Sequence, residues 1–278
     1  MTATPISREA LLRVVKTLPA APQILAQLGR LLLDITSDLR DVTVLLKRDA
    51  ALTARIIRIS NSAIYNTGLP LASLEEALAR VGYTEVYRLA GFAAVAQLAD
   101  QHLPIYGMTG VQLRENALFT ALMMEITAPA AGLDEREAYT AGLLRSVGKI
   151  AIDRIGKGSG LTFDAGSSEG IAAWESSQMG MTNVEAAAVI LGEWRFPSAT
   201  VAAIRDQYAE EPNDSALAQL LNLAAGAAER RGHGAPGEQG YWSLTPERLA
   251  AAGISRKQLD AAEQVAVEKF EALRSAMD

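Results

Sequence analysis

The sequence contains no cysteine and only two histidines, His102 and His233, among its 278 residues. The lack of cysteine excludes disulfide bonds, thiolate zinc sites and cysteine nucleophiles. A zinc or di-iron site usually draws on several histidine or cysteine ligands, so two histidines that lie far apart in the chain argue against such a site. We therefore expect a protein without a bound cofactor.

Long apolar runs and an excess of positive charge are also missing. No stretch reaches the roughly 18 uninterrupted apolar residues of a membrane span, and the first residues lack a basic region followed by an apolar run. Lysine and arginine total 26 against 32 aspartates and glutamates, which gives a formal net charge of -6. We therefore expect a cytoplasmic protein that binds neither membranes nor DNA or RNA over large surfaces.

Helix-forming patterns dominate the residues that are present. The chain contains 50 alanines, apolar residues recur at helical spacing, and capping boxes begin at Ser73, Thr182 and Ser255. No window alternates polar and β-branched apolar residues between turns, so the sequence predicts an all-α fold. The expected helices cover residues 7–17, 22–34, 39–47, 50–60, 74–81, 84–99, 111–130, 135–155, 169–178, 183–194, 198–210, 214–231, 247–252 and 256–275.

Helical signals lapse at two places, residues 101–110 and the glycine-rich segment 232–240. These breaks suggest an N-terminal helical subdomain (1–105), a central helical core (106–231), and a loop with a C-terminal helix pair (232–278). We interpret the glycine-rich segment as a flexible loop.

Four strings, in this order, carry a family resemblance: Lys47–Ala63, Leu74–Gly82, Glu137–Lys149 and Met179–Ala188. Together with Leu18–Leu25 before them and Trp194–Pro197 after them, they resemble the HDOD family, the regulatory relatives of HD-superfamily phosphohydrolases in bacterial signalling proteins. The resemblance covers roughly residues 14–211. It implies an N-terminal helical bundle packed on a degenerate HD-like core.

The same resemblance implies that the metal site of the enzymes has been lost. Metal-dependent HD enzymes carry a His-Asp pair in the string that matches Gly142–Lys149, and this chain has Arg145 and Ser146 there. Asn116 and Asn183 stand where the resemblance places further histidines, and so do Asp206, Gln207 and Tyr208 at the end of the later string Ala203–Tyr208. A guanidinium at the centre of such a site repels a divalent cation, so we expect no metal and no catalysis.

The degenerate pocket is a candidate ligand site, formed by Asn116, Arg145, Ser146, Lys149, Asn183 and Gln207. Arg145 and Lys149 lie four residues apart in a predicted helix and would share a face able to receive a nucleotide phosphate. The interpretation we favour is that both cations are solvated or pair with Asp153 and nearby carboxylates.

A second candidate is a basic edge on the helix predicted over residues 50–60. Leu52, Ile56 and Ile59 form an apolar stripe that Arg48, Arg55 and Arg58 border. The edge could dock an acidic partner segment. The interpretation we favour is that the arginines pair with carboxylates of the same domain.

The resemblance thus predicts a non-catalytic signal-transduction module that acts by protein–protein interaction, with signalling proteins as unknown partners. One alternative is a sensor that binds a cyclic dinucleotide, another nucleotide or a small anion in the degenerate pocket. A residual metal-dependent phosphohydrolase is the less favoured alternative.

Overall fold

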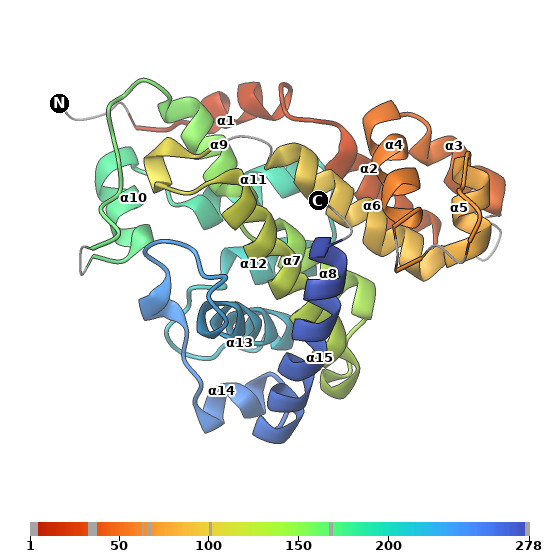
Figure 1. Ribbon diagram of the computed structural model, residues 1–278. Coiled ribbons are helices and arrows are strands. Elements are labelled where there is room, and N and C mark those ends of the chain that lie inside the picture. Colours follow the sequence, from red (N-terminus) through yellow and green to blue (C-terminus); the bar gives the residue numbers. More distant parts are fainter. Residues whose placement is uncertain are drawn as a thin grey trace.

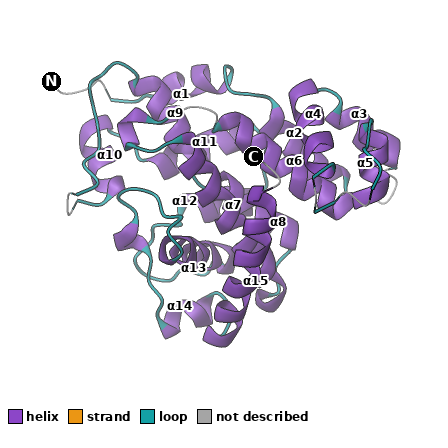
Figure 2. Ribbon diagram, viewed as in Figure 1, coloured by secondary structure: helices purple, strands orange, loops and turns teal. Residues whose placement is uncertain are grey.

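The structure, a computed structural model, describes residues 5–32, 38–62, 64–65, 68–99, 102–166 and 169–275. Over these residues the chain forms fifteen α-helices and three short 3-10 helices, and it forms no β-strand (Figure 2). The predicted all-α fold is confirmed. The last two residues of the helix predicted over 22–34 lie outside the described residues.

Helices α2 to α6 form an N-terminal bundle, on the right in Figure 1. The bundle consists of α2 (Ala21–Leu31), α3 (Leu39–Leu46), α4 (Ala50–Ser60), α5 (Leu74–Val81) and α6 (Tyr83–Leu98). Helix α1 (Arg8–Val15) lies outside this bundle and packs on α9 and α11 of the core. The first helix therefore ties the N-terminal part of the chain to the core.

The core is built around α7 (Gly110–Thr127), which packs against α8, α13 and α15. Around it lie α8 (Glu135–Leu144), α9 (Val147–Gly156), α10 (Ile171–Met179), α11 (Asn183–Glu193), α12 (Ser198–Arg205), α13 (Ala216–Arg230), α14 (Pro246–Ala251) and α15 (Arg256–Ser275). Pro104–Tyr106, Ala128–Ala131 and Gln239–Tyr241 are 3-10 helices. One continuous apolar cluster joins the bundle to the core, as expected for a single cooperative unit.

The capping boxes predicted at Thr182 and Ser255 are confirmed, whereas at Ser73 only the serine half forms, because the Glu76 side chain accepts its hydrogen bond from the Ala72 amide and not from the Ser73 amide. The Ser73 hydroxyl accepts a hydrogen bond from the Glu76 amide at 3.2 Å, and the Thr182 hydroxyl accepts one from the Glu185 amide at 3.3 Å. At Ser255 the side chain of Gln258 accepts the reciprocal bond from the Ser255 amide at 2.8 Å. Each such cap stabilises its helix by about 1 kcal/mol, which is why these helix starts can be located from the sequence.

Two glycines allow helices of the core to approach each other closely. A Cβ atom on Gly142 of α8 would lie 2.6 Å from the Cα atom of Ala121 in α7. A Cβ atom on Gly148 of α9 would lie 1.8 Å from the carbonyl oxygen of Asn183 in α11. No larger residue fits at either contact without moving a helix backbone.

The helix predicted over residues 135–155 is wrong in one respect, because the structure breaks it into α8 and α9. Ser146 sits at the break with φ -104° and ψ 11°, outside the helical range. Apolar periodicity runs through both helices, so the pattern alone does not reveal the change of direction. The helix predicted over 198–210 likewise ends early, at Arg205.

Within the described part of the chain, no helix combines the length and the apolar character that crossing a membrane requires. This finding agrees with the absence of long apolar runs in the sequence.

Candidate functional site

The break between α8 and α9 places two cations in the interior of the core. Arg145 is the C-cap residue of α8, and Lys149 lies in the first turn of α9. Both side chains are fully buried, at 0% exposure. The expectation that they are solvated or pair with Asp153 is therefore wrong, and so is the idea that they share the face of one continuous helix, but pairing with a carboxylate is confirmed, since both cations pair with Glu238. The Asp153 carboxylate instead accepts a hydrogen bond from the Ile105 amide at 2.9 Å.

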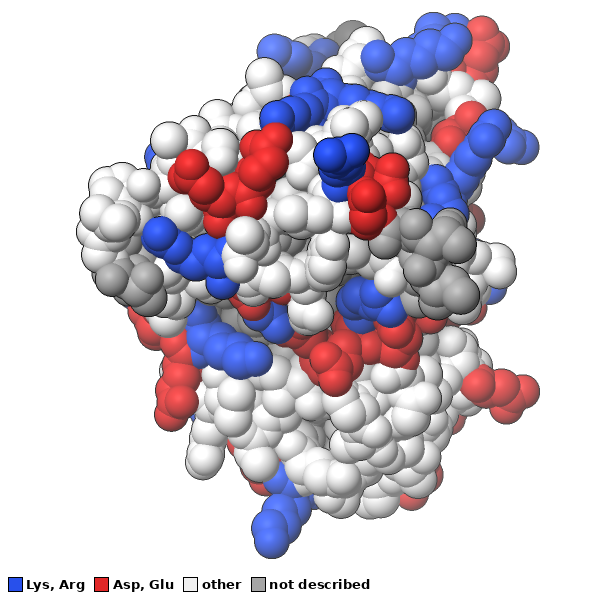
Figure 3. Space-filling view, turned by 90° about the vertical axis from the view of Figure 1, so that its right-hand side faces the viewer, with Lys and Arg blue, Asp and Glu red and all other residues white. Residues whose placement is uncertain are grey.

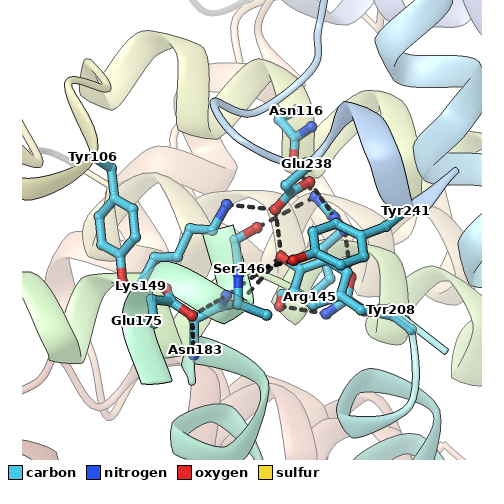
Figure 4. A network of polar contacts seen from close by, with 12 residues as sticks. Tyr106, Asn116, Arg145, Ser146, Lys149, Glu175, Asn183, Tyr208, Glu238 and Tyr241 are labelled. Carbon is cyan, nitrogen blue, oxygen red and sulfur yellow. Dashed lines mark hydrogen bonds and ion pairs between the residues drawn. The ribbon is translucent and has the colours of Figure 1, made fainter. Parts of the chain in front are cut away.

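One carboxylate, that of Glu238, binds both cations (Figure 4). Its Oε2 atom lies 2.6 Å from Nη2 of Arg145, and its Oε1 atom accepts a hydrogen bond from Nζ of Lys149. The Tyr208 hydroxyl donates to the same Oε1 atom at 2.6 Å. Burial by itself would raise the pKa of Glu238, but the charges of Arg145 and Lys149 lower it to about 2. Glu238 is therefore ionised at neutral pH.

The remaining donors of the Arg145 guanidinium are also satisfied. Nε donates to Oε1 of Gln207 at 2.9 Å, and Nη1 donates to Oδ1 of Asn116 at 2.7 Å and to the Ser146 hydroxyl at 3.4 Å. The Trp242 ring lies 5.0 Å from Cζ of Arg145, within the range of a cation–π contact. Because every nitrogen has a partner, the pocket holds the guanidinium in one orientation.

A second carboxylate, Glu175, lies beside Lys149. The Tyr106 hydroxyl donates to Glu175 at 2.7 Å, and the backbone amide and side-chain amide of Asn183 donate at 2.7 and 2.9 Å. Burial raises the pKa of Glu175. The Tyr106 ring centroid lies 5.6 Å from Nζ of Lys149. The network therefore combines two cations with two carboxylates, all inside the core.

The glycine-rich segment 232–240 delivers Glu238 to this network. Asn116 donates from Nδ2 to the His233 carbonyl at 2.6 Å, and the Ile171 amide donates to the Gly237 carbonyl at 2.9 Å. The His233 ring centroid lies 5.3 Å from that of Phe119 and 4.4 Å from that of Phe270. The segment is irregular, as the sequence predicts, but it is anchored to the core along its length and seals the pocket.

The residue types in this pocket do not fit a metal ion. Ammonium and guanidinium groups offer no lone pairs, and both oxygens of Glu238 already accept hydrogen bonds from Arg145, Lys149 and Tyr208. Across the described ranges there is no group of three or more histidine, aspartate or glutamate side chains arranged to hold a metal. The arrangement is that of a buried ion-pair network.

The structure brings all six predicted pocket residues into one network. Asn116, Ser146 and Gln207 contact Arg145 directly, and Lys149 is joined to it through Glu238. Asn183 reaches the network through Tyr208 and Glu175. The resemblance missed Glu238, the residue that completes the pocket. Its one sequence signal is that it is the single carboxylate in an otherwise glycine-rich segment.

The three arginines of the predicted basic edge lie in two different environments. Arg48 donates to the side chain of Gln27 at 3.3 Å, so its partner is an amide and not a carboxylate. Arg55 and Arg58 lie further along α4 and line a groove of about 490 Å³. Arg114 of α7 and Arg274 of α15 line the same groove. The tertiary fold thus adds two arginines to the edge that the sequence suggested.

A comparison with protein families matches the HDOD domain to residues 18–210. Among solved structures, the chain is similar to an HDOD domain protein of unknown function from Geobacter sulfurreducens, at a TM-score of 0.67 and 19% identity, covering 98% of this chain and 97% of that one. It is also similar to a candidate phosphohydrolase from Shewanella amazonensis SB2B, at a TM-score of 0.66 and 23% identity, covering 96% and 97%. None of the curated proteins matches the chain.

A third similar structure is a candidate signal transduction protein from Marinobacter aquaeolei VT8, with a TM-score of 0.68 and 21% identity. The alignment covers 94% of this chain but only 59% of that protein. At these identities the likeness concerns the fold.

Proposed function

The chain belongs to the HDOD domain family, and on that premise we propose that it is a non-catalytic regulatory module that acts by binding another protein in bacterial cytoplasmic signalling. The buried cluster of Arg145, Lys149 and Glu238 carries this proposal. By the resemblance to metal-dependent HD enzymes, Arg145 and Ser146 stand where those enzymes carry their His-Asp pair. Without metal ligands there, the scaffold has no centre for phosphate hydrolysis.

The names of the similar structures point to two different roles, a phosphohydrolase and a signal transduction protein. The side chains of this chain favour the second role. A hydrolase of this fold needs lone pairs around a cation, whereas Arg145 and Lys149 place two positive charges in that space. Because the interior is filled by the chain's own residues, a signal has to be received and passed on at the surface.

The pocket as folded does not favour the nucleotide-sensing alternative. A nucleotide phosphate could reach Arg145 and Lys149 only if Glu238 left both cations, because all three side chains are at most 1% exposed. Removing one partner from a buried ion pair costs roughly 3–5 kcal/mol. A ligand would have to make up this free energy before it gained any affinity.

Two measurements on the full-length chain test the proposal. The first is elemental analysis after incubation with Mn²⁺, Mg²⁺ or Zn²⁺, together with turnover of bis(p-nitrophenyl) phosphate. We expect no stoichiometric metal, and the same background turnover in the wild type and in Arg145→Ala. A contaminating phosphatase would affect both proteins equally, so stoichiometric metal with turnover that Arg145→Ala abolishes would overturn the proposal.

The second measurement is affinity purification from the native cell with cross-linking and mass spectrometry. We expect a signalling protein that, when it is purified in turn, recovers this chain. If reciprocal purification recovers no protein, the role as an interaction module is wrong.

A further inference from the structure

A small pocket of about 220 Å³ lies between helix α13 and residues 239–244. We call it the α13 pocket. Its lining consists of Asn222, Leu223, Gly226, Glu229 and Arg230 from α13 and of Gln239, Trp242, Ser243 and Leu244. Sites for drug-sized ligands measure roughly 300–1,000 Å³. The α13 pocket therefore suits a ligand smaller than a nucleotide.

Glu229 brings an unpaired carboxylate to this pocket. Its Oε2 atom is buried, and no described residue donates a hydrogen bond to it. A Cβ atom on Gly234 would lie 1.7 Å from this oxygen, so the glycine makes room for the side chain. Burial and the negative charge of Glu238 raise the pKa of Glu229, whereas the positive charge of Arg145 lowers it. A buried carboxylate without a partner is costly, so a cationic group placed beside it would be stabilised.

Arg230, the next residue, brings a positive charge to the same pocket. Its Nη2 atom lies 2.9 Å from Oε2 of Glu263, and Oε1 of Glu263 lies 2.6 Å from Nε of Arg231. One carboxylate therefore serves two guanidinium groups, which leaves one positive charge in excess within this trio. Nη1 of Arg230 lies beside the pocket, 3.7 Å from the place of a Cβ atom on Gly226. Within the described part of the chain, Glu229 and Arg230 form no ion pair with each other, so each can bind a charged group of a ligand.

The rest of the lining is partly apolar. Trp242 is half-buried, and Leu223 and Leu244 line the pocket with it. An ammonium group near an indole ring gains a cation–π attraction, and an aliphatic group gains from burial against leucine. A carboxylate, a guanidinium and an apolar wall together match the three parts of an α-amino acid, which are its ammonium group, its carboxylate and its side chain.

The larger groove lined by Arg55 and Arg58 offers no such unpaired charge. Both arginines have interactions of their own within the chain, Arg274 pairs with Glu271 at 2.6 Å, and Glu115 lines the same groove. Figure 3 likewise shows acidic and basic side chains together in the furrow between the upper and lower halves of the molecule. Of these two sites, the α13 pocket is therefore the one with charges available to a ligand.

We propose that the α13 pocket binds a free α-amino acid with an aliphatic side chain. Its ammonium group pairs with Glu229, its carboxylate pairs with Arg230, and its side chain packs against Trp242 and Leu244. Arginine suits the carboxylate because its planar fork of donors can bind both oxygens. This ligand site goes beyond the proposed function, which concerns a protein partner.

Isothermal titration calorimetry of the full-length protein with L-leucine tests the proposal. Two analogues each lack one charge: L-leucinamide has no carboxylate, and N-acetyl-L-leucine has no ammonium group. We expect saturable binding of one L-leucine per chain. Each analogue should bind about tenfold more weakly or worse, because it leaves one charged side chain of the pocket without a partner.

Two variants assign the charges to their residues. Glu229→Gln and Arg230→Gln should each weaken the binding of L-leucine by about tenfold or more. Glu229→Gln should weaken the binding of N-acetyl-L-leucine far less, and Arg230→Gln should do the same for L-leucinamide. The matched control is Arg231→Gln, which removes the same charge from a neighbour that also pairs with Glu263 but lies outside the pocket lining. This control should bind L-leucine as the wild type does.

Thermal unfolding shows which variants are folded, and the two analogues decide the question on the wild type if a variant is not. The proposal is overturned by the absence of saturable L-leucine binding up to about 10 mM, by equal binding of L-leucine and both analogues, or by wild-type affinity in Glu229→Gln. None of these outcomes bears on the recovery of a protein partner, so the proposed function would stand if the amino-acid site failed.

Discussion

Replacing Glu238 with alanine removes the one carboxylate that binds both Arg145 and Lys149. The three side chains are at most 1% exposed, so the substitution leaves two buried cations without a counter-charge. The fall of the Glu238 pKa from 4.5 to about 2 corresponds to about 3 kcal/mol of favourable interaction. Breaking a buried ion pair by removing one partner typically costs roughly 3–5 kcal/mol. We therefore expect Glu238→Ala to lower the free energy of unfolding by about 3–5 kcal/mol.

Urea unfolding and thermal unfolding measure this loss. In a protein of this size it corresponds to a fall in Tm of roughly 6–20 °C. The matched control is Glu247→Ala, an exposed glutamate in the first turn of α14, which should change stability by less than about 1 kcal/mol. Glu238→Gln keeps the volume and removes the charge, so it separates the loss of the ion pair from the cavity that alanine leaves.

Restoring the stability of Glu238→Ala with an added carboxylate is a second test of the same prediction. The alanine variant leaves a space beside two buried cations, and a small carboxylate of the right charge should enter it. We expect sodium acetate to raise the Tm of Glu238→Ala, while sodium chloride at equal ionic strength does not, and to leave the wild type unchanged. The reasoning is refuted if Glu238→Ala is as stable as Glu247→Ala, or if acetate and chloride act alike.

Three further predictions follow from the same core. Because the pKa of Glu238 is lowered, the ion pair stabilises the fold above about pH 4.5, and this stabilisation is lost as the pH falls towards 2. Between pH 5 and pH 3 the free energy of unfolding in urea should therefore fall more steeply for the wild type than for Glu238→Gln. Equal slopes for the two proteins would contradict this. Gly148→Ala should destabilise the protein by at least about 1–3 kcal/mol, since its Cβ atom would lie 1.8 Å from the carbonyl oxygen of Asn183 in α11. A Cβ atom added at Gly192 would meet nothing within 4 Å, so Gly192→Ala should stabilise the protein by roughly 0.5–1 kcal/mol. Thermal unfolding of both variants measures this contrast. The double variant Arg145→His/Ser146→Asp should not bind manganese stoichiometrically, because Lys149 and Glu238 still occupy the pocket; one ion per chain in elemental analysis would show that the pocket reopens easily.

Local patterns predicted the helices well because each pattern acts within a few residues. The capping serines and threonines at Ser73, Thr182 and Ser255 satisfy amides three positions away, so the sequence alone locates those helix starts. The break at Ser146 was not predicted, because apolar periodicity continues on both sides of it and the turn depends on how α9 meets α11. At that contact Gly148 allows an approach that no pattern within one helix encodes.

The candidate sites were predicted in part. The family motif identified Arg145 and Lys149, and with them the loss of the His-Asp pair, but the sequence left open whether the two cations are solvated or pair with Asp153 and nearby carboxylates. Their burial depends on Glu238, which lies 93 residues beyond Arg145 in the chain. The basic edge was similarly incomplete, because Arg114 and Arg274 reach the groove from helices that are distant in sequence.

The sequence by itself determined the helical class, the caps, the absence of cysteine and the scarcity of histidine, because these follow from composition and from interactions between neighbours in the chain. Only the tertiary structure decided that the two cations of the core are neutralised inside the protein while Arg55 and Arg58 line an accessible groove. The physical reason is that burial and charge pairing depend on which distant segments meet. At the surface, water solvates the charge of a lysine or arginine, whereas a buried one needs a counter-charge from another segment of the chain.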